Sequence, residues 1–309
     1  MPRTFYGPYD ERNQNYANAG NANLGRWPMG TRLVLPDERE YRFVLNDGTV
    51  EIAGNLYQAV AAVANHTNRP VDVARAIDVV LASATLTGTA AAVDIYAEGM
   101  VHSNEAVGEA YAYRIRRANT VGAANAAAVA SGVLTVNFDA GEMIQVALDT
   151  TSFLTFTRNR YHQVLITAAP PTGLISGVSP GVAALDRYYW SQTKGYAAVL
   201  ANLTLLAGLP VQADIAVAGA VENVKRRVRT GGTTVALVTT GLWGISLTNQ
   251  DGTTVGAALS IFALSSVASA AVPATYEINA GIAYNSPPVG MCVKANASTE
   301  FALIDLNIN

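Results

Sequence analysis

The sequence contains one pattern typical of a nucleophilic enzyme, Gly177-Val178-Ser179-Pro180-Gly181, which matches the G-x-S-x-G motif of serine hydrolases. In that motif the serine hydroxyl attacks the substrate, and the backbone N–H of the next residue helps to bind the oxyanion. Pro180 has no N–H to donate. The three histidines, His66, His102 and His162, all precede Ser179, whereas the α/β-hydrolase order places the histidine after the serine. We therefore do not expect a hydrolase.

Other residue types that carry chemistry are too scattered to predict a site. The histidines show no metal-binding H-x-x-x-H spacing, and neither the G-x-x-x-x-G-K-[ST] nor the G-x-G-x-x-G phosphate-binding pattern occurs. The single cysteine, Cys292, excludes an intrachain disulfide and is expected to be a small buried residue. Asp139 and Glu142 bracket a turn between two expected strands. These observations predict no enzyme, no cofactor and no metal.

The charge of the chain is unusually low. Charged residues make up 14% of the 309 residues and the net charge is −3, whereas about a quarter of the residues in soluble domains are charged. This balance disfavours direct nucleic-acid binding, which requires a strongly basic face. A surface so poor in charge is poorly soluble when exposed, so we expect neighbouring proteins to cover much of it.

Two clusters of basic residues stand out, at 114–117 and at 225–229, and the second includes Arg226 and Arg227. One interpretation is that their charges keep a solvated strand edge from unwanted pairing. The other is that they contact an acidic surface on a partner, with a strength that falls as salt concentration rises. The sequence leaves both interpretations open.

The elements that would position these residues are organised around residues 186–220. β-Branched and aromatic residues occur there in bursts broken by Lys194-Gly195 and by Gly208-Leu209-Pro210, which predicts short strands joined by tight turns. Consecutive side chains on a strand alternate between its faces, so the three adjacent rings cannot share one face: Tyr188, Tyr189 and Trp190. At least one ring is expected to meet another layer or another subunit, unless it lies along the surface of its own domain.

The first 30 residues are rich in Asn, Gly, Tyr and Arg and show no periodicity. Such a segment cannot bury enough apolar surface by itself to offset the entropy of ordering it. We expect an extended arm that lies across a partner, anchored by five aromatic residues: Phe5, Tyr6, Tyr9, Tyr16 and Trp27. No secretory signal pattern is visible in this arm. The most apolar stretch, residues 256–272, is interrupted by serines, so we expect no membrane span.

The remaining pattern predicts an all-β protein with sandwich or barrel-like domains. A hairpin is expected from residues 41–45 and 49–52 around Asn46-Asp47-Gly48, because these turn residues tolerate positive φ. Further strands are expected at residues 93–96, 111–115, 134–138, 144–148, 153–156, 164–167 and 301–308. The Pro- and Gly-containing break at 169–173 suggests three parts: the arm at 1–30, a β-rich domain at 31–170 and a second at 171–309.

Several short runs resemble the head decoration, or cement, proteins of tailed bacteriophages: Tyr41-Arg42-Phe43-Val44, Gly54-Asn55-Leu56-Tyr57-Gln58, Ala64-Asn65-His66-Thr67-Asn68, Tyr111-Ala112-Tyr113-Arg114-Ile115 and Tyr189-Trp190-Ser191-Gln192-Thr193-Lys194-Gly195. The resemblance extends from about Leu33 to Ala220. It implies a non-enzymatic virion protein, made in the host cytoplasm and placed on the outside of the capsid. Such a protein is a homo-oligomer, often a trimer, and bridges neighbouring copies of the major capsid protein. The resemblance identifies no functional site.

Two alternatives remain open at this stage. One is another virion component, namely a major capsid, vertex or tail protein, for which the long arm and the tract at 228–249 leave room. A capsid protein of the common tailed-phage fold would need a long spine helix, and the sequence shows no helical period of that length. The other is a glycan- or receptor-binding β module, in which the rings at 188–190 stack on sugars.

Overall fold

A computed structural model describes residues 27–117, 125, 128–224, 287–297 and 299–308, together with the backbone of three short strands at 4–6, 247–248 and 254–255. Contacts between Cα atoms divide the chain into two units, Met1–Val224 with Asn285–Asn309, and Lys225–Tyr284. In the second unit the described residues are β16 (Leu247–Thr248) and β17 (Thr254–Val255), which pair antiparallel.

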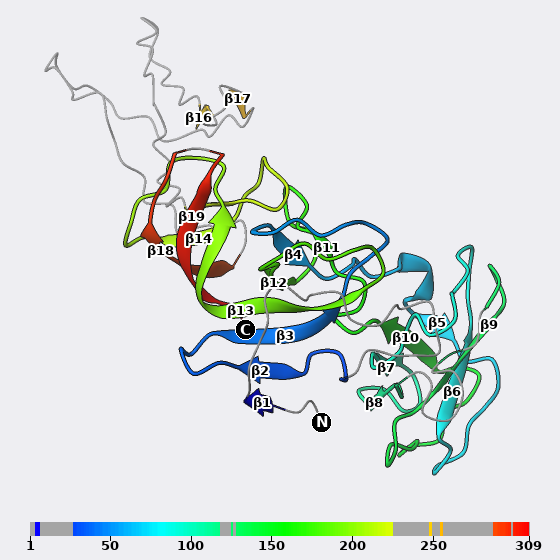
Figure 1. Ribbon diagram of the computed structural model, residues 1–309. Coiled ribbons are helices and arrows are strands. Elements are labelled where there is room, and N and C mark those ends of the chain that lie inside the picture. The colour runs from blue at the N-terminus through cyan, green and yellow to red at the C-terminus, as the bar shows by residue number, and fades with distance from the viewer. Residues whose placement is uncertain are drawn as a thin grey trace, which may run out of the picture. The chain divides into compact units, whose positions relative to one another are not determined.

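The first unit is all-β, as the sequence predicts, and its main sheet runs in the order β1-β2-β3-β13-β19-β18-β14-β15 (Figure 1). These strands are β1 (Thr4–Tyr6), β2 (Arg32–Val34), β3 (Glu40–Leu45), β13 (Tyr188–Leu200), β19 (Phe301–Asn307), β18 (Pro288–Lys294), β14 (Pro210–Ala213) and β15 (Val221–Asn223). Three further strands join this sheet beside β13: β4 (Leu56–Gln58), β11 (Leu165–Ile166) and β12 (Ile175–Val178).

Two smaller antiparallel sheets complete the unit. One has the order β5-β10-β7-β8, formed by β5 (Arg69–Pro70), β10 (Phe153–Thr157), β7 (Met100–Glu105) and β8 (Ala112–Arg114). The other pairs β6 (Leu81–Thr85) with β9 (Val133–Asn137). The helical content of the described residues is a single 3₁₀ turn, η1 (Ala64–His66).

Strand β13 is the longest strand of the described residues, and it connects two parts of the main sheet. Its first half pairs with β3, and its second half, from Lys194 to Leu200, pairs with β19. The prediction that Lys194-Gly195 separates two short strands is therefore wrong. The chain stays extended because a bulge at Thr193 shifts the register against β3 and Gly195 takes a φ of +82°, a value that glycine adopts without strain.

The three adjacent rings of β13 point into two different parts of the core, which confirms that they do not share one face. Tyr188 and Trp190 belong to the largest buried cluster, where Tyr188 stacks on Phe43 with ring centroids 5.3 Å apart. Tyr189 belongs to a separate cluster with Val44. Further along the strand, Ala197 and Val199 enter a third cluster. One strand thus contributes to all three buried clusters.

The largest cluster also joins segments on both sides of the break at 169–173. It combines residues of β3, β7, β9 and β10 with Tyr188 and Trp190 of β13. Likewise β3, before the break, pairs along its length with β13, after it. The boundary expected at residue 170 therefore falls inside the first unit, because the pairing that builds the main sheet crosses it.

The hairpin expected around Asn46-Asp47-Gly48 is only half correct. The turn is present, and Asp47 Oδ1 accepts a 2.8 Å hydrogen bond from Thr49 N. However, residues 49–52 form no strand, because β3 already pairs with β2 on one side and with β13 on the other. The segment after the turn instead bonds to a distant loop through Glu51 N and Ala183 O, 2.8 Å apart.

Most of the other expected strands are present. Strands β8, β9, β10, β11 and β19 lie where alternation predicts them, and β19 buries Ala302, Ile304 and Leu306 on one face. Two predictions are wrong. Residues 93–96 form a turn in which Asp94 has a φ of +58°. Residues 144–148 make isolated hydrogen bonds to Val79 and Arg75 rather than a ladder.

Candidate interaction surface

The three rings proposed as partner contacts on β13 are not exposed. Tyr188, Tyr189 and Trp190 retain at most 4% of their accessible surface. A ring that stacks on a sugar or on a partner needs an open face. The structure therefore assigns these side chains to the core and corrects their expected role as a contact surface.

The ends of the expected arm contact their own chain. Phe5 and Tyr6 lie in β1, which pairs in parallel with β2 of the same sheet. Trp27 packs edge-on against Phe43, with ring centroids 5.2 Å apart, and also contacts Trp190. For Trp27 the contact with the chain itself replaces the expected contact with a partner, whereas for Phe5 and Tyr6 the structure describes the backbone pairing of β1 alone. Tyr9, Tyr16, Arg226 and Arg227 lie outside the described residues.

A buried carboxylate fixes the point where the arm joins the body. Glu98 Oε2 accepts a 2.6 Å hydrogen bond from Met29 N. Its Oε1 lies 3.1 Å from Nε of Arg117, which also donates a hydrogen bond to Trp27 O. Burial raises the pKa of Glu98 to about 6, although Arg117 and the Met29 N–H both favour its ionised form. Of the basic residues at 114–117, Arg117 thus pairs internally, and Arg114 pairs with Asp139 at 3.5 Å.

An exposed apolar surface lies elsewhere, on the side of the main sheet opposite its buried face. It is formed by β13, β19 and β18, which are neighbours in the sheet (Figure 1), and we call this surface the outer face. Its members are Tyr196 (59% exposed), Ala198, Met291 (46%), Val293 (41%), Phe301 (45%) and Leu303 (36%). The side chains between them along the strands are buried, so these strands are apolar on both faces.

The register of the three strands places these residues in rows. Tyr196 of β13 lies opposite Asp305 of β19, which lies opposite Met291 of β18. In the next row Ala198 lies opposite Leu303, which lies opposite Lys294. Cross-strand neighbours of this kind are about 5 Å apart, so the outer face brings apolar side chains of three strands close together, with the Asp305 carboxylate between Tyr196 and Met291 and the Lys294 ammonium group at the end of the next row.

A hollow of about 300 Å³ opens beside the outer face. Tyr196 and Ala197 of β13 line it, together with Phe301 of β19 and Arg39. The remaining lining residues are Ala53, Gly54, Val178, Ser179, Pro180, Gln192 and Ala198. This volume lies at the lower end of the range for ligand-binding cavities, and it is large enough for one bulky side chain or sugar ring.

Gly54 explains how the Phe301 ring reaches the wall of this hollow. The Gly54 backbone has a φ of +78°, and a Cβ atom at that position would collide with the ring. Ser179, from the hydrolase-like motif, also lines the hollow, but its side chain is fully buried. Its hydroxyl donates a 2.6 Å hydrogen bond to Gly181 O. The arrangement suits the binding of a side chain or ring rather than nucleophilic chemistry.

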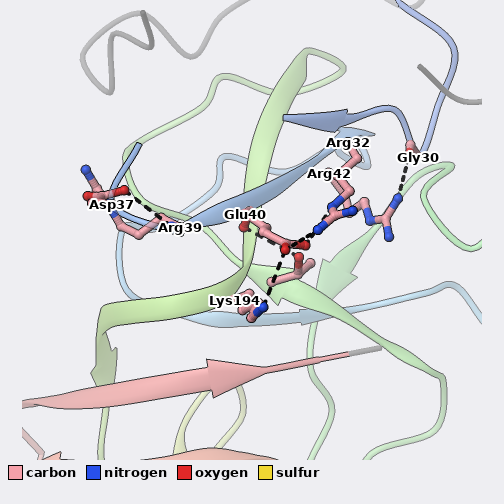
Figure 2. Close-up of polar contacts among 8 residues, drawn as sticks. Gly30, Arg32, Asp37, Arg39, Glu40, Arg42 and Lys194 are labelled. Carbon is pink, nitrogen blue, oxygen red and sulfur yellow. Dashed lines mark hydrogen bonds and ion pairs between the residues drawn. The ribbon is translucent and has the colours of Figure 1, made fainter. Parts of the chain in front are cut away.

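Charged residues in and beside β2, β3 and β13 lie close to one another, as Figure 2 shows, and one of them, Arg39, lines the hollow. Glu40 lies between the side chains of Arg32 and Lys194, and its carboxylate is 3.6 Å from Lys194 Nζ. The hydrogen bond and charge of Arg32 lower the pKa of Glu40, as does Lys194. Arg39 is held by a 2.6 Å hydrogen bond to Asp37. The carboxylates of Glu40 and Asp37 thus offset most of the positive charge of these basic side chains.

The histidines do not form a site. His66 is fully buried, with its ring nitrogens bonded to the Tyr96 hydroxyl and to Thr89 O. Burial, helped by the nearby Arg158 charge, lowers the pKa of His162 to about 4. Within the described parts of the chain there is no group of three His, Cys, Asp or Glu side chains able to hold a metal ion. The same residues include no helix long and apolar enough to cross a membrane.

Sequence reasoning missed the outer face, although a signal for it exists. The alternation of residues 301–308 identifies the buried face of β19, but Phe301 and Leu303 fall between those positions and are also apolar. A strand with large apolar residues on both of its faces is expected to be covered on both sides.

Comparison with protein-family models, with curated proteins and with solved structures finds no match for this chain.

Proposed function

We propose that the protein is a structural component of a virion, a decoration or cement subunit that stabilises the head of a tailed phage by bridging neighbouring capsid proteins. The observation that carries this proposal is the outer face, an exposed apolar sheet surface next to a hollow. Monomeric soluble proteins rarely expose contiguous apolar patches of this kind, and such patches mark contact sites with other proteins. The low content of charged residues, 14%, agrees with extensive coverage by neighbours.

A decoration role is favoured over a major capsid role by the secondary structure. The spine helix of the common tailed-phage capsid fold has no counterpart among the described residues, where η1 is the sole helical element. A decoration subunit needs only a rigid body with surfaces for its neighbours. Repeated weak contacts around a closed lattice then add up by avidity.

Removal of the protein from assembled particles tests the proposal. Virions that carry this chain are washed at low ionic strength or with a chelator, and both the released protein and the remaining heads are examined by electron microscopy. Release with intact but thermally weaker heads supports a decoration role, and restoration of head stability by added protein completes the case. Collapse of the heads indicates a lattice-forming capsid protein instead, and absence of the chain from virions refutes the proposal.

A second function, a glycan-binding module, is favoured by one feature of the hollow. Tyr196 and Phe301 are exposed aromatic residues on its wall, and Arg39 supplies a guanidinium group beside them. Aromatic faces with nearby hydrogen-bond donors bind sugar rings. Titration with neutral hexose oligosaccharides, read by NMR chemical shifts of these rings, separates the two functions. Binding that Tyr196→Ala abolishes supports the glycan function.

A further inference from the structure

The loop between β3 and β4, residues 46–55, places a carboxyl group inside the protein and apolar side chains outside it. Glu51 retains 1% of its accessible surface, whereas its neighbours Val50 and Ile52 are 52% and 55% exposed. Burying an ionisable group costs free energy unless the group is paired, and exposed apolar side chains contribute no burial energy. The middle of this loop is therefore folded against the preference of its own side chains.

The surroundings of Glu51 suit its neutral form alone. The titratable groups that act on it are Asp47 of the same loop and Tyr57 of β4, and Tyr189 of β13 lies beside them. The residue that faces it from loop 179–187 is Ala183, which carries no charge. Among the described residues, no partner bonds in normal geometry to either Glu51 carboxyl oxygen or to the Tyr189 hydroxyl. An ionised Glu51 would be unpaired here, and the Asp47 charge would repel it.

The closed position of the segment 48–53 depends on contacts that a local movement can break. Glu51 N donates a 2.8 Å hydrogen bond to Ala183 O, and Ile52 N donates a 2.7 Å hydrogen bond to the Tyr57 hydroxyl. The residues on either side of the segment are anchored separately. Asp47 O accepts a 3.0 Å hydrogen bond from Asp186 N, and Gly54 O accepts a 2.9 Å hydrogen bond from Leu200 N.

Glycines at the two ends of this segment allow it to pivot. Gly48 has open space around the position of a Cβ atom, and Gly54 has a φ of +78°. Glycine adopts more backbone conformations than any other residue, so a rotation at these two positions is not opposed by a side chain. Ala53, the last residue of the segment, lines the hollow. A movement of residues 48–53 consequently alters the wall of the hollow.

We propose that residues 48–53 form a pH-sensitive latch beside the hollow, closed while Glu51 is protonated and open once Glu51 is ionised. In the open arrangement the Glu51 carboxylate reaches water, the hydrogen bonds to Ala183 and Tyr57 are lost, and Ala53 leaves the wall of the hollow. The latch does not depend on what the hollow binds or on whether the protein belongs to a virion.

The direction of the pH effect follows from the two environments of Glu51. Burial raises the pKa of Glu51 in the closed latch to about 8, whereas the pKa of a carboxyl group in water is near the ordinary value of 4.5. The closed latch is therefore most stable below pH 4.5. Between pH 4.5 and about 8 each pH unit shifts the equilibrium towards the open latch by about tenfold, and the effect levels off above this window.

Amide hydrogen exchange of the full chain measures the opening of the latch, when it is read by mass spectrometry and corrected for the intrinsic effect of pH on exchange. Protection of residues 48–53 should fall by about a hundredfold between pH 6 and pH 8, because each of the two pH units contributes about tenfold. Strand β19 should remain better protected than the latch at every pH, because the latch opens without unfolding of the sheet.

Variants of two carboxyl groups test the assignment to Glu51. Glu51→Gln cannot ionise and should keep the protection of residues 48–53 constant over this range, and Glu51→Met serves the same purpose if the amide variant does not fold. The matched control is Glu105→Gln, which changes an exposed carboxyl group on β7 and should retain the wild-type pH dependence. A pH dependence that persists in the folded Glu51 variants overturns the role of Glu51.

Two further outcomes decide whether the change is local and whether it reaches the hollow. Equal protection of residues 48–53 and of β19 at every pH shows that the segment is released only when the whole unit unfolds, which overturns the latch. The Ala53 methyl signal in NMR spectra should shift between pH 6 and pH 8 in the wild-type chain and stay constant in Glu51→Gln. An Ala53 signal that does not move while the latch loses protection overturns the coupling to the hollow.

Discussion

Glu51 lies in an environment that opposes its charge. Its side chain is buried beside the cluster that contains Tyr57 and Tyr189, and neither carboxyl oxygen accepts a hydrogen bond of normal geometry. Burial raises the pKa of Glu51 to about 8; nearby Tyr57 partly offsets this, and the Asp47 charge adds to it. The residue is therefore protonated in the folded protein at neutral pH.

This protonation predicts a pH-dependent stability. An unfolded Glu51 has a pKa near 4.5, so between pH 4.5 and about 8 the folded chain holds a proton that the unfolded chain has released. Stability then falls as pH rises across this window, by roughly 3–5 kcal/mol, and levels off above it. Glu51→Gln cannot ionise and should flatten this slope in urea unfolding experiments. Glu105→Gln, an exposed control, should keep it, and an unchanged slope in Glu51→Gln would contradict the assignment.

Gly54 controls the position of Phe301. Gly54→Ala combines a strained φ with a collision against the Phe301 ring. We therefore expect the free energy of unfolding to fall by about 2–4 kcal/mol and the ring to be displaced from the hollow. Two control variants separate the effect of the strained φ from that of the collision. Gly208→Ala has a similar φ of +81° with open space around it and should cost about 1 kcal/mol, whereas Gly48→Ala, without either problem, should be nearly neutral. Equal losses in Gly54→Ala and Gly208→Ala would exclude the collision.

At the scale of elements, β13 holds the three buried clusters together through a few large side chains. Trp190 contacts Phe43 and Trp27, with ring centroids 5.0 and 5.3 Å apart. Trp190→Ala should lower the unfolding free energy by about 3–5 kcal/mol, measured by chemical denaturation. Tyr196→Ala on the same strand changes an exposed ring and should stay within about 0.5 kcal/mol of the wild type. A small effect of Trp190→Ala would show that the ring is not a core residue.

The sequence predicts where the strands lie more reliably than it predicts what each strand pairs with or packs against. Alternation locates β19 and its buried face because Ala302, Ile304 and Leu306 follow the two-residue period of a strand. Alternation cannot show that the opposite face of β19 is exposed, because Phe301 and Leu303 on that face are apolar as well. The expected hairpin after β3 fails for a related reason. Local turn residues specify a reversal, but the preceding strand β2 and the distant strand β13 already pair with the two edges of β3.

The whole molecule consists of two units, and the first should fold without the second. Strands β15 and β18 flank β14, since Val211 pairs with both Asn223 and Gly290. Asn223 and Gly290 are thus about 10 Å apart across the sheet, and because β15 and β18 run parallel, the ends left at residues 224 and 287 are also offset along the strands. A Gly/Ser linker of about ten residues spans this gap. The shortened chain should melt cooperatively within a few degrees of the first transition of the full chain in calorimetry. An insoluble or unfolded product would show that the first unit depends on the second.

The position of β19 has a consequence for biosynthesis. This strand lies between β13 and β18, yet it follows them both in the chain, and residues 201–300 separate Leu200 from its partner Phe301. On the ribosome, the second half of β13 therefore waits with an unpaired edge while the intervening residues are translated. The apolar surface that Phe301 and Leu303 complete does not exist during this interval. An open strand edge of this kind is prone to pair with other chains, so we expect the nascent chain to be most vulnerable to aggregation before β19 is made.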